Sequence, residues 1–173
     1  MESANAKGSA RLLHLSIAAS VLAHGEVFDP GLLHDMLYAG GKLPILLYPD
    51  TPGDQARGMP VPPSLDAGLL RDVAGLRLVV LDGTWRKSRK MLYQNPLLQA
   101  LPRLPLTGMA DSHYLIRKAH APNQLSTLEA SCHALGLLHG NIAAFEALLA
   151  AFDDFVAHFQ QTGGNLGAHA NRA

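Results

Sequence analysis

A carboxylate, a hydroxyl and an indole stand close together in the segment Asp82-Gly83-Thr84-Trp85. Asp82 directly follows an apolar run and directly precedes a stretch with helical periodicity. A carboxylate at such a position can act as a base or contact a ligand, but it can equally cap the helix by accepting hydrogen bonds from its first N–H groups. The pattern alone favours the cap. Trp85 could stack on a nucleobase, although burial in the core is the more common fate of tryptophan.

Two further polar segments are expected near the same place. Tyr48-Pro49-Asp50 follows an apolar run, and Leu125-Ser126-Thr127 precedes a helical pattern. Ligands of open parallel sheets collect at the carboxyl ends of the strands, so we expect all three segments to lie at one edge of the sheet. Ser126 and Glu129 also form the capping-box pattern S-x-x-E, which is a purely structural alternative for that segment.

Positive charge is concentrated in the middle of the chain. Residues 82–120 carry an excess of Lys and Arg over two aspartates, whereas residues 121–160 contain neither Lys nor Arg. A basic centre beside acidic helices fits a polyanionic partner. Without further motifs, a solvated helix face is the favoured interpretation. The basic residues concerned are Arg86, Lys87, Arg89, Lys90, Arg103, Arg117 and Lys118.

The sequence lacks the motifs of disulfide-rich proteins, metal sites, common nucleotide-binding folds and serine hydrolases. The single cysteine, Cys132, excludes an intramolecular disulfide and a Cys-rich zinc module, and its apolar neighbours predict a packing role. Nine histidines occur without HExxH-type spacing, so we predict no metal site. No GxGxxG, P-loop or GxSxG motif is present.

Length and composition predict one folded domain. The chain has 173 residues, of which 48% are hydrophobic and 16% charged, with a formal net charge of zero. No apolar run is long enough to cross a bilayer and no secretory signal is evident, so we expect a cytoplasmic protein without a membrane partner. Its oligomeric state is not predicted.

Hydrophobic periodicity predicts alternating strands and helices, hence an α/β fold with a mainly parallel sheet flanked by helices. A long Pro/Gly-rich loop over 49–64 is expected to be functional or mobile. The predicted strands cover residues 11–17, 43–48 and 76–81; the predicted helices begin near 30, 65, 84, 127 and 142; short elements are expected at 103–106 and 113–116; and a disordered tail covers 161–173.

Several ordered segments carry a resemblance to a known family. The stretch LVVLDGTWRKSRKMLYQNPLLQALPRLPL, followed by SHYLIRK and LSTLEA, resembles the DTW-domain family, which is named after an Asp–x–Thr–Trp element. The upstream segments SARLLHLS and LLYPD are also similar to that family, so the resemblance covers about residues 9–160. A single DxTW element would be weak evidence, whereas several segments in matching order are specific.

The resemblance implies a tRNA-uridine aminocarboxypropyltransferase. Such an enzyme moves the 3-amino-3-carboxypropyl group of S-adenosylmethionine to N3 of a uridine in tRNA and releases methylthioadenosine. It also implies a SPOUT-like domain, in which the chain can form a knotted pocket. Many relatives begin with a cysteine-rich, zinc-binding segment, and no cysteine precedes Cys132 here. A truncated, non-catalytic RNA-binding relative is therefore an alternative. An RNA methyltransferase that uses the same cofactor is another, and its product would be adenosylhomocysteine instead of methylthioadenosine.

The same resemblance suggests roles for individual residues. Asp82 is the candidate base for the N3 proton, or a contact to the donor's ammonium or to the uracil. Arg117 could pair with the donor's carboxylate or with a tRNA phosphate. No metal is required, because the sulfonium already carries positive charge. The expected contacts to the donor are Tyr48, Asp50, Thr84, Trp85, Arg117, Leu125, Ser126 and Thr127, and those to RNA phosphates are Arg86, Lys87, Arg89, Lys90 and Lys118.

Overall fold

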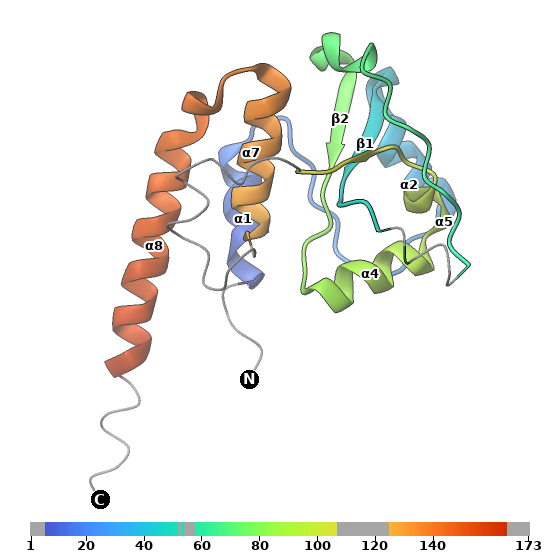
Figure 1. The fold of residues 1–173 in the computed structure, drawn as a ribbon. Helices are drawn as coiled ribbons and strands as arrows, with labels where there is room; N and C mark the ends of the chain where they lie inside the picture. Colours follow the sequence, from blue (N-terminus) through green and yellow to red (C-terminus); the bar gives the residue numbers. More distant parts are fainter. Residues whose placement is uncertain (1–5, 52, 54–57, 107–124, 166–173) are drawn as a thin grey trace, which may run out of the picture.

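A small parallel sheet forms the centre of one half of the protein (Figure 1). The computed structural model describes residues 6–51, 53, 58–106 and 125–165. Strand β1 (Leu43–Leu47) lies between β2 (Leu76–Val79) and β3 (Arg103–Leu104), and both neighbours pair with it in parallel. The predicted strands at 43–48 and 76–81 and the parallel α/β class are thus confirmed. Because all three strands point the same way, their carboxyl ends share one edge.

Helices α2 (Pro30–Tyr38), α4 (Trp85–Gln94) and α5 (Pro96–Gln99) flank this sheet. Asp29 caps α2, the helix predicted to begin near residue 30, by accepting a hydrogen bond from Leu32 N at 3.0 Å. A short 3₁₀ turn, η1 (Ala39–Gly41), ends α2. The core of this half is formed by Leu33, Leu37, Leu46, Tyr48, Met59, Leu92, Leu98 and Leu101.

The connection from β1 to β2 is less helical than predicted. In place of one short helix over 65–73 there are two 3₁₀ turns, η2 (Leu69–Arg71) and η3 (Val73–Gly75). Asp72 separates them, and its side chain accepts a hydrogen bond from Gly75 N at 3.3 Å. This side-chain bond closes a tight turn and competes with continuation of the helix.

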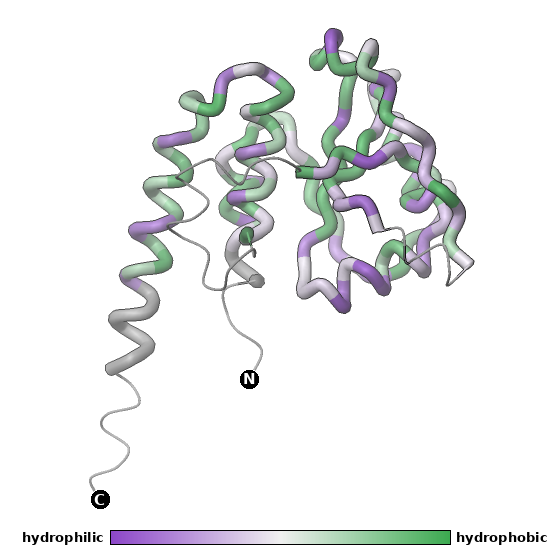
Figure 2. Tube along the Cα trace, in the orientation of Figure 1, coloured by the Kyte–Doolittle hydropathy of each residue, from purple (hydrophilic) through white to green (hydrophobic). Residues whose placement is uncertain are grey.

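A second core lies among three helices beside the sheet: α1 (Ala6–Ser16), α7 (Thr127–His139) and α8 (Glu146–Asn165). Green, hydrophobic stretches of these helices alternate with purple, hydrophilic ones in Figure 2. A 3₁₀ turn, η5 (Ile142–Phe145), leads into α8. The buried residues of this core are Leu128, Cys132, Leu149 and Phe152, with Leu12 and Leu13 of α1 packed against them.

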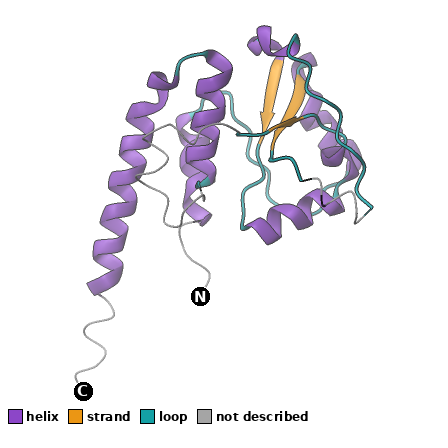
Figure 3. Ribbon diagram, viewed as in Figure 1, coloured by secondary structure: helices purple, strands orange, loops and turns teal. Residues whose placement is uncertain are grey.

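The predicted strand over residues 11–17 is wrong, because this segment belongs to helix α1 (Figure 3). Ser9 is buried, Leu12 and Leu13 pack against the helical core, and Leu15 is 73% exposed. Spacings of three and four residues between the inward positions are helical. The apparent alternation in RLLHLSI requires Leu15 to be buried. Leu15 is exposed because α7 and α8 pack against the other side of this helix, and the local sequence does not show where those helices lie.

The C-terminal helix is longer than expected. Helix α8 continues to Asn165, whereas the tail was predicted to begin at residue 161. The helix predicted from residue 127 is confirmed as α7. The short element expected at 113–116 lies outside the described residues. Among the described helices, none is long and apolar enough to cross a bilayer.

Candidate functional site

The carboxylate of Asp82 joins the two halves of the protein. Thr127, the first residue of α7, donates a hydrogen bond from Oγ1 to Asp82 Oδ1 at 2.6 Å. Asp82 follows β2 at the carboxyl edge of the sheet, and both side chains are part-buried. Two segments separated by 45 residues along the chain therefore meet at this carboxylate.

The interpretation of Asp82 as a helix cap is wrong. Helix α4 is capped by Thr84, whose Oγ1 accepts a hydrogen bond from Lys87 N at 3.4 Å. Gly83 has a φ of 153°, a conformation that side-chain-bearing residues rarely adopt. Asp82 thus precedes the cap by two residues, and its carboxylate faces Thr127 instead of the start of α4.

The predicted capping box at the start of α7 is confirmed. Glu129 N donates to Ser126 Oγ at 3.2 Å, and Ser126 N donates to Glu129 Oε2 at 2.8 Å. This reciprocal pair fixes the first turn of the helix. It thereby fixes the backbone of Thr127, the next residue, opposite Asp82. Leu125 immediately precedes the box and is half-buried.

Trp85 is not a core residue. Its side chain is 61% exposed at the start of α4, and its ring centroid lies 5.3 Å from that of Tyr48. Tyr48 follows β1 and is only 4% exposed. A buried tyrosine therefore supports an indole that is accessible for stacking on a planar ligand.

Arg103 is a site residue that the sequence analysis counted only as charge. It opens β3, is 6% exposed, and its guanidinium carbon lies 5.2 Å from the Tyr48 ring centroid. Its Nη1 donates to Pro49 O at 3.2 Å and to Thr51 Oγ1 at 2.8 Å. A charged residue inside the apolar segment LPRLPL is the signal that could have identified it.

A cavity of about 470 Å³ adjoins Arg103. It lies between the sheet edge and the Pro-rich part of the 49–64 loop, so that this loop contributes to a concave surface. Asp50, one of the expected donor contacts, lies on its wall. The lining consists of Asp50, Thr51, residues 60–65, Arg103 and Pro105.

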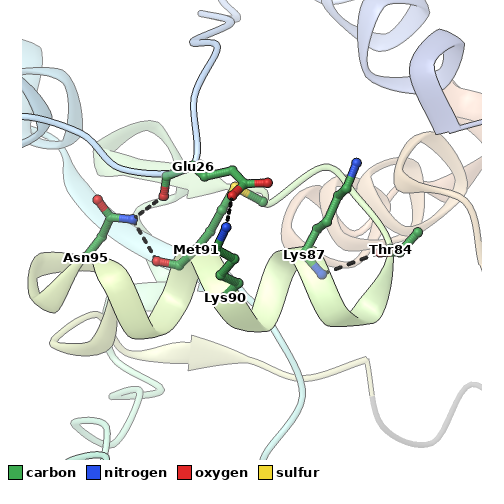
Figure 4. Close-up of polar contacts among 6 residues, drawn as sticks. All are labelled: Glu26, Thr84, Lys87, Lys90, Met91 and Asn95. Atoms are coloured by element: carbon green, nitrogen blue, oxygen red, sulfur yellow. Dashed lines mark hydrogen bonds and ion pairs between the residues drawn. The ribbon is translucent and has the colours of Figure 1, made fainter.

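The basic residues of α4 do not all lie in equivalent environments. Hydrophilic residues, drawn purple, gather along this helix in Figure 2, and Arg86 is exposed. Lys90 is paired with Glu26 at 2.5 Å (Figure 4). The hydrogen bond and the charge of Lys90 hold the pKa of Glu26 below its usual value; desolvation opposes this shift, and the charge of Lys87 adds the weakest effect. Lys87 and Arg89 are half-buried.

Asn95 holds the segment that carries Glu26 against α4. Its Nδ2 donates to Glu26 O at 2.8 Å and to Met91 O at 2.7 Å, while its Oδ1 accepts from Phe28 N at 3.0 Å. Hydrogen bonds to the backbone of residues 26 and 28 therefore hold Glu26, the acidic partner of Lys90, beside α4. Arg117 and Lys118 lie outside the described residues.

Comparison with known proteins identifies the family of the chain. The DTW domain matches residues 1–160. The chain belongs to the DTW domain family. It is 33% identical over 72 residues to tRNA-uridine aminocarboxypropyltransferase 2 of Macaca fascicularis and of Mus musculus, a segment covering 42% of this chain and 24% of each relative. The Drosophila melanogaster protein of the same name is 35% identical over 80 residues, or 44% of this chain and 32% of that protein. No solved structure matches the chain.

The single cysteine of this DTW domain is buried away from the sheet edge. Cys132 lies in the helical core, where burial, together with the charge of Glu129, raises the pKa of its thiol to about 11. A neutral thiol is a poor nucleophile and metal ligand. Among the described residues, no group of three or more His, Cys, Asp or Glu could hold a metal ion.

Proposed function

We propose that this DTW-domain protein transfers the 3-amino-3-carboxypropyl group of S-adenosylmethionine to N3 of a uridine in tRNA and releases methylthioadenosine. Its family and the names of its relatives support the reaction class. The aligned segments span only about a quarter to a third of those relatives, so the assignment also needs support from this chain's own residues.

The Asp82–Thr127 contact is the observation on which the proposal chiefly rests. In the reaction the uridine N3 forms a bond to the methylene carbon, the carbon–sulfur bond breaks, and its electrons remain on sulfur, giving a neutral thioether. The N3 proton passes to Asp82. A positioned base of this kind typically contributes about 10²–10⁴-fold to the rate. Thr127 occupies one carboxylate oxygen, so it orients the other toward the substrate.

The donor is proposed to bind along the carboxyl edge of the sheet. The exposed Trp85, supported by Tyr48, offers a face for a planar base, and the cavity beside Asp50 has the volume of a small-molecule site. The charged donor thus fits the residues present. The proposed donor contacts remain Tyr48, Asp50, Thr84, Trp85, Arg117, Leu125, Ser126 and Thr127.

The basic face of α4 is proposed to bind the phosphates of tRNA. Such contacts supply affinity that depends on salt and not on base sequence. Lys90 is paired with Glu26, so its contact with a phosphate requires that this ion pair be released. The proposed phosphate-binding set is Arg86, Lys87, Arg89, Lys90 and Lys118.

Three broader features belong to the same proposal. They are a domain comprising residues 9–160, a SPOUT-like arrangement around the donor, and a cytoplasmic location. Each was expected from the sequence or the family resemblance.

The test is product analysis after incubation with S-adenosylmethionine and unmodified tRNA. We expect methylthioadenosine and aminocarboxypropyl-uridine by mass spectrometry, and a loss of both in Asp82→Asn. Formation of S-adenosylhomocysteine would instead identify a methyltransferase. Salt-sensitive tRNA binding without any product would identify a non-catalytic RNA-binding protein.

A further inference from the structure

The cavity beside Arg103 carries opposite charges on its walls. Both Arg103 and Asp50 line the cavity: Asp50 follows β1, and Arg103 opens β3 beside Leu46, near the carboxyl end of β1. Between them, the wall is largely proline, with Val61 and Leu65. An apolar pocket with a few charged groups is the usual form of a small-molecule site.

Arg103 makes no direct ion pair within the part of the chain that the structure describes. Its two hydrogen bonds run from Nη1 to neutral acceptors, Pro49 O and Thr51 Oγ1. Its Nε is buried with no hydrogen-bond partner among these residues. A buried charge is costly unless it is paired, so an arginine that is only 6% exposed and makes no direct ion pair favours an anionic ligand.

The guanidinium is also held in place before any ligand binds. Nη1 is anchored by the loop that follows β1, and the ring of Tyr48 lies 5.2 Å from the guanidinium carbon. Fixed orientation reduces the entropy lost on binding. Nη1 already donates to two acceptors and Nε is buried, so Nη2 is the nitrogen left to donate a charge-assisted hydrogen bond to a ligand carboxylate.

We propose that this cavity binds the amino-acid end of a small zwitterion, with Arg103 contacting the α-carboxylate and Asp50 the α-ammonium. The inference rests on the proposed function for the identity of that zwitterion, which is the amino-acid end of the S-adenosylmethionine donor. It adds a carboxylate-binding residue that lies in the described structure, unlike Arg117.

The negative wall distinguishes this ligand from an RNA phosphate. A phosphodiester has no positive group to place beside Asp50, and its own charge would be repelled there. An α-amino acid carries an ammonium and a carboxylate on the same carbon, so it can present a positive group to Asp50 and a negative group to Arg103. The transferred aminocarboxypropyl group carries both charges, so methylthioadenosine makes neither the Arg103 nor the Asp50 contact. The protein can therefore release methylthioadenosine while both contacts to the transferred group persist.

Calorimetric titration with three probes tests the proposal. S-adenosylhomocysteine retains the amino-acid end, 5′-methylthioadenosine lacks it, and inorganic phosphate represents the competing ligand. We expect Arg103→Gln and Asp50→Lys each to weaken S-adenosylhomocysteine binding by about 10- to 150-fold, the range for hydrogen bonds between charged groups. Methylthioadenosine binding should change less than about twofold. Asp154→Lys, the same charge change on exposed α8, is the matched control and should leave both affinities unchanged.

Each other result overturns the inference. Equal losses for both nucleosides would assign the residues a purely structural role, and unchanged affinities would place the carboxylate elsewhere. If Asp50→Lys strengthens phosphate binding while Arg103→Gln abolishes it, and S-adenosylhomocysteine affinity is unaffected, the cavity is a phosphate site. Asp50 is exposed, so its variant remains informative even if Arg103→Gln does not fold.

A separate probe distinguishes failure of this inference from failure of the proposed function. If the native protein binds neither nucleoside, the proposed function fails, and titration with L-methionine followed by NMR decides the zwitterion site. Binding that is lost in Asp50→Lys supports the site, and the absence of L-methionine binding refutes it.

Discussion

The contact between Thr127 and Asp82 gives the sharpest test of the proposed chemistry. Thr127→Val removes the hydroxyl that donates to Asp82 Oδ1 at 2.6 Å while nearly preserving the shape of the side chain. A hydrogen bond to a charged group contributes about 1.5–3 kcal/mol. If that energy orients the base in the transition state, kcat/KM should fall by about 10- to 150-fold.

The assay is the initial rate of methylthioadenosine release with saturating tRNA. Asp82→Asn should lower this rate by about 10²–10⁴-fold, as expected for loss of a positioned base. Adding Thr127→Val to Asp82→Asn should then have little further effect, because the hydroxyl acts through the carboxylate. Ser131→Ala is the control: it removes a buried hydroxyl from α7 that bonds Thr127 O and does not touch Asp82, so its rate should match that of the native protein.

Two results would refute this reasoning. If the two substitutions multiply as independent effects, Thr127 does not act through Asp82. If Asp82→Asn retains the native rate, the proton is accepted elsewhere. Circular dichroism and thermal unfolding of each variant identify any loss of rate that comes from unfolding alone.

Three further predictions follow from the structure. Gly136→Ala should lower the free energy of unfolding by about 1–3 kcal/mol, because the added Cβ would lie 2.9 Å from Ile142 Cα; a higher midpoint in urea would contradict this close approach. Cys132, whose pKa is raised to about 11 by burial, should resist Ellman's reagent at pH 8 in the native protein and react on unfolding, so rapid labelling without denaturant would refute its burial. Glu26→Gln should release Lys90 from its ion pair, tighten tRNA binding and increase the number of ions released on binding by about one. If the salt dependence of tRNA binding, measured by filter binding, is unchanged in this variant, Lys90 does not contact the RNA.

The Glu26–Lys90 pair also sets a direction for pH dependence. The pKa of Glu26 is lower in the folded protein than in the unfolded chain, chiefly because of its hydrogen bond to Lys90. The pair therefore stabilises the fold above the ordinary carboxyl pKa, and this contribution disappears as the pH falls through the lowered value. Since the pair lies at the surface, the contribution is screened by solvent and salt.

Local sequence determined much of the secondary structure. Asp29, Thr84 and Ser126 lie at helix starts where their side chains accept backbone hydrogen bonds, and such caps depend on residues within one turn. The apolar runs at β1 and β2 are likewise short-range signals of buried parallel strands. The strand predicted around Leu15 is wrong because the burial pattern of this segment depends on which helices pack against it, and local spacing does not contain that information.

The family could be recognised from the order of the segments, but the arrangement of the site depends on tertiary structure. The sequence placed Asp82, Asp50 and Thr127 near strand and helix ends, which is a local property. Only folding brings Thr127 against Asp82 across 45 residues, and only folding buries Arg103 beside Tyr48 and pairs Lys90 with Glu26. The physical reason is that the energy of a contact depends on the distance between two groups in space. The sequence gives the charge of each residue, but only the folded structure shows which other residue lies close enough to interact with it.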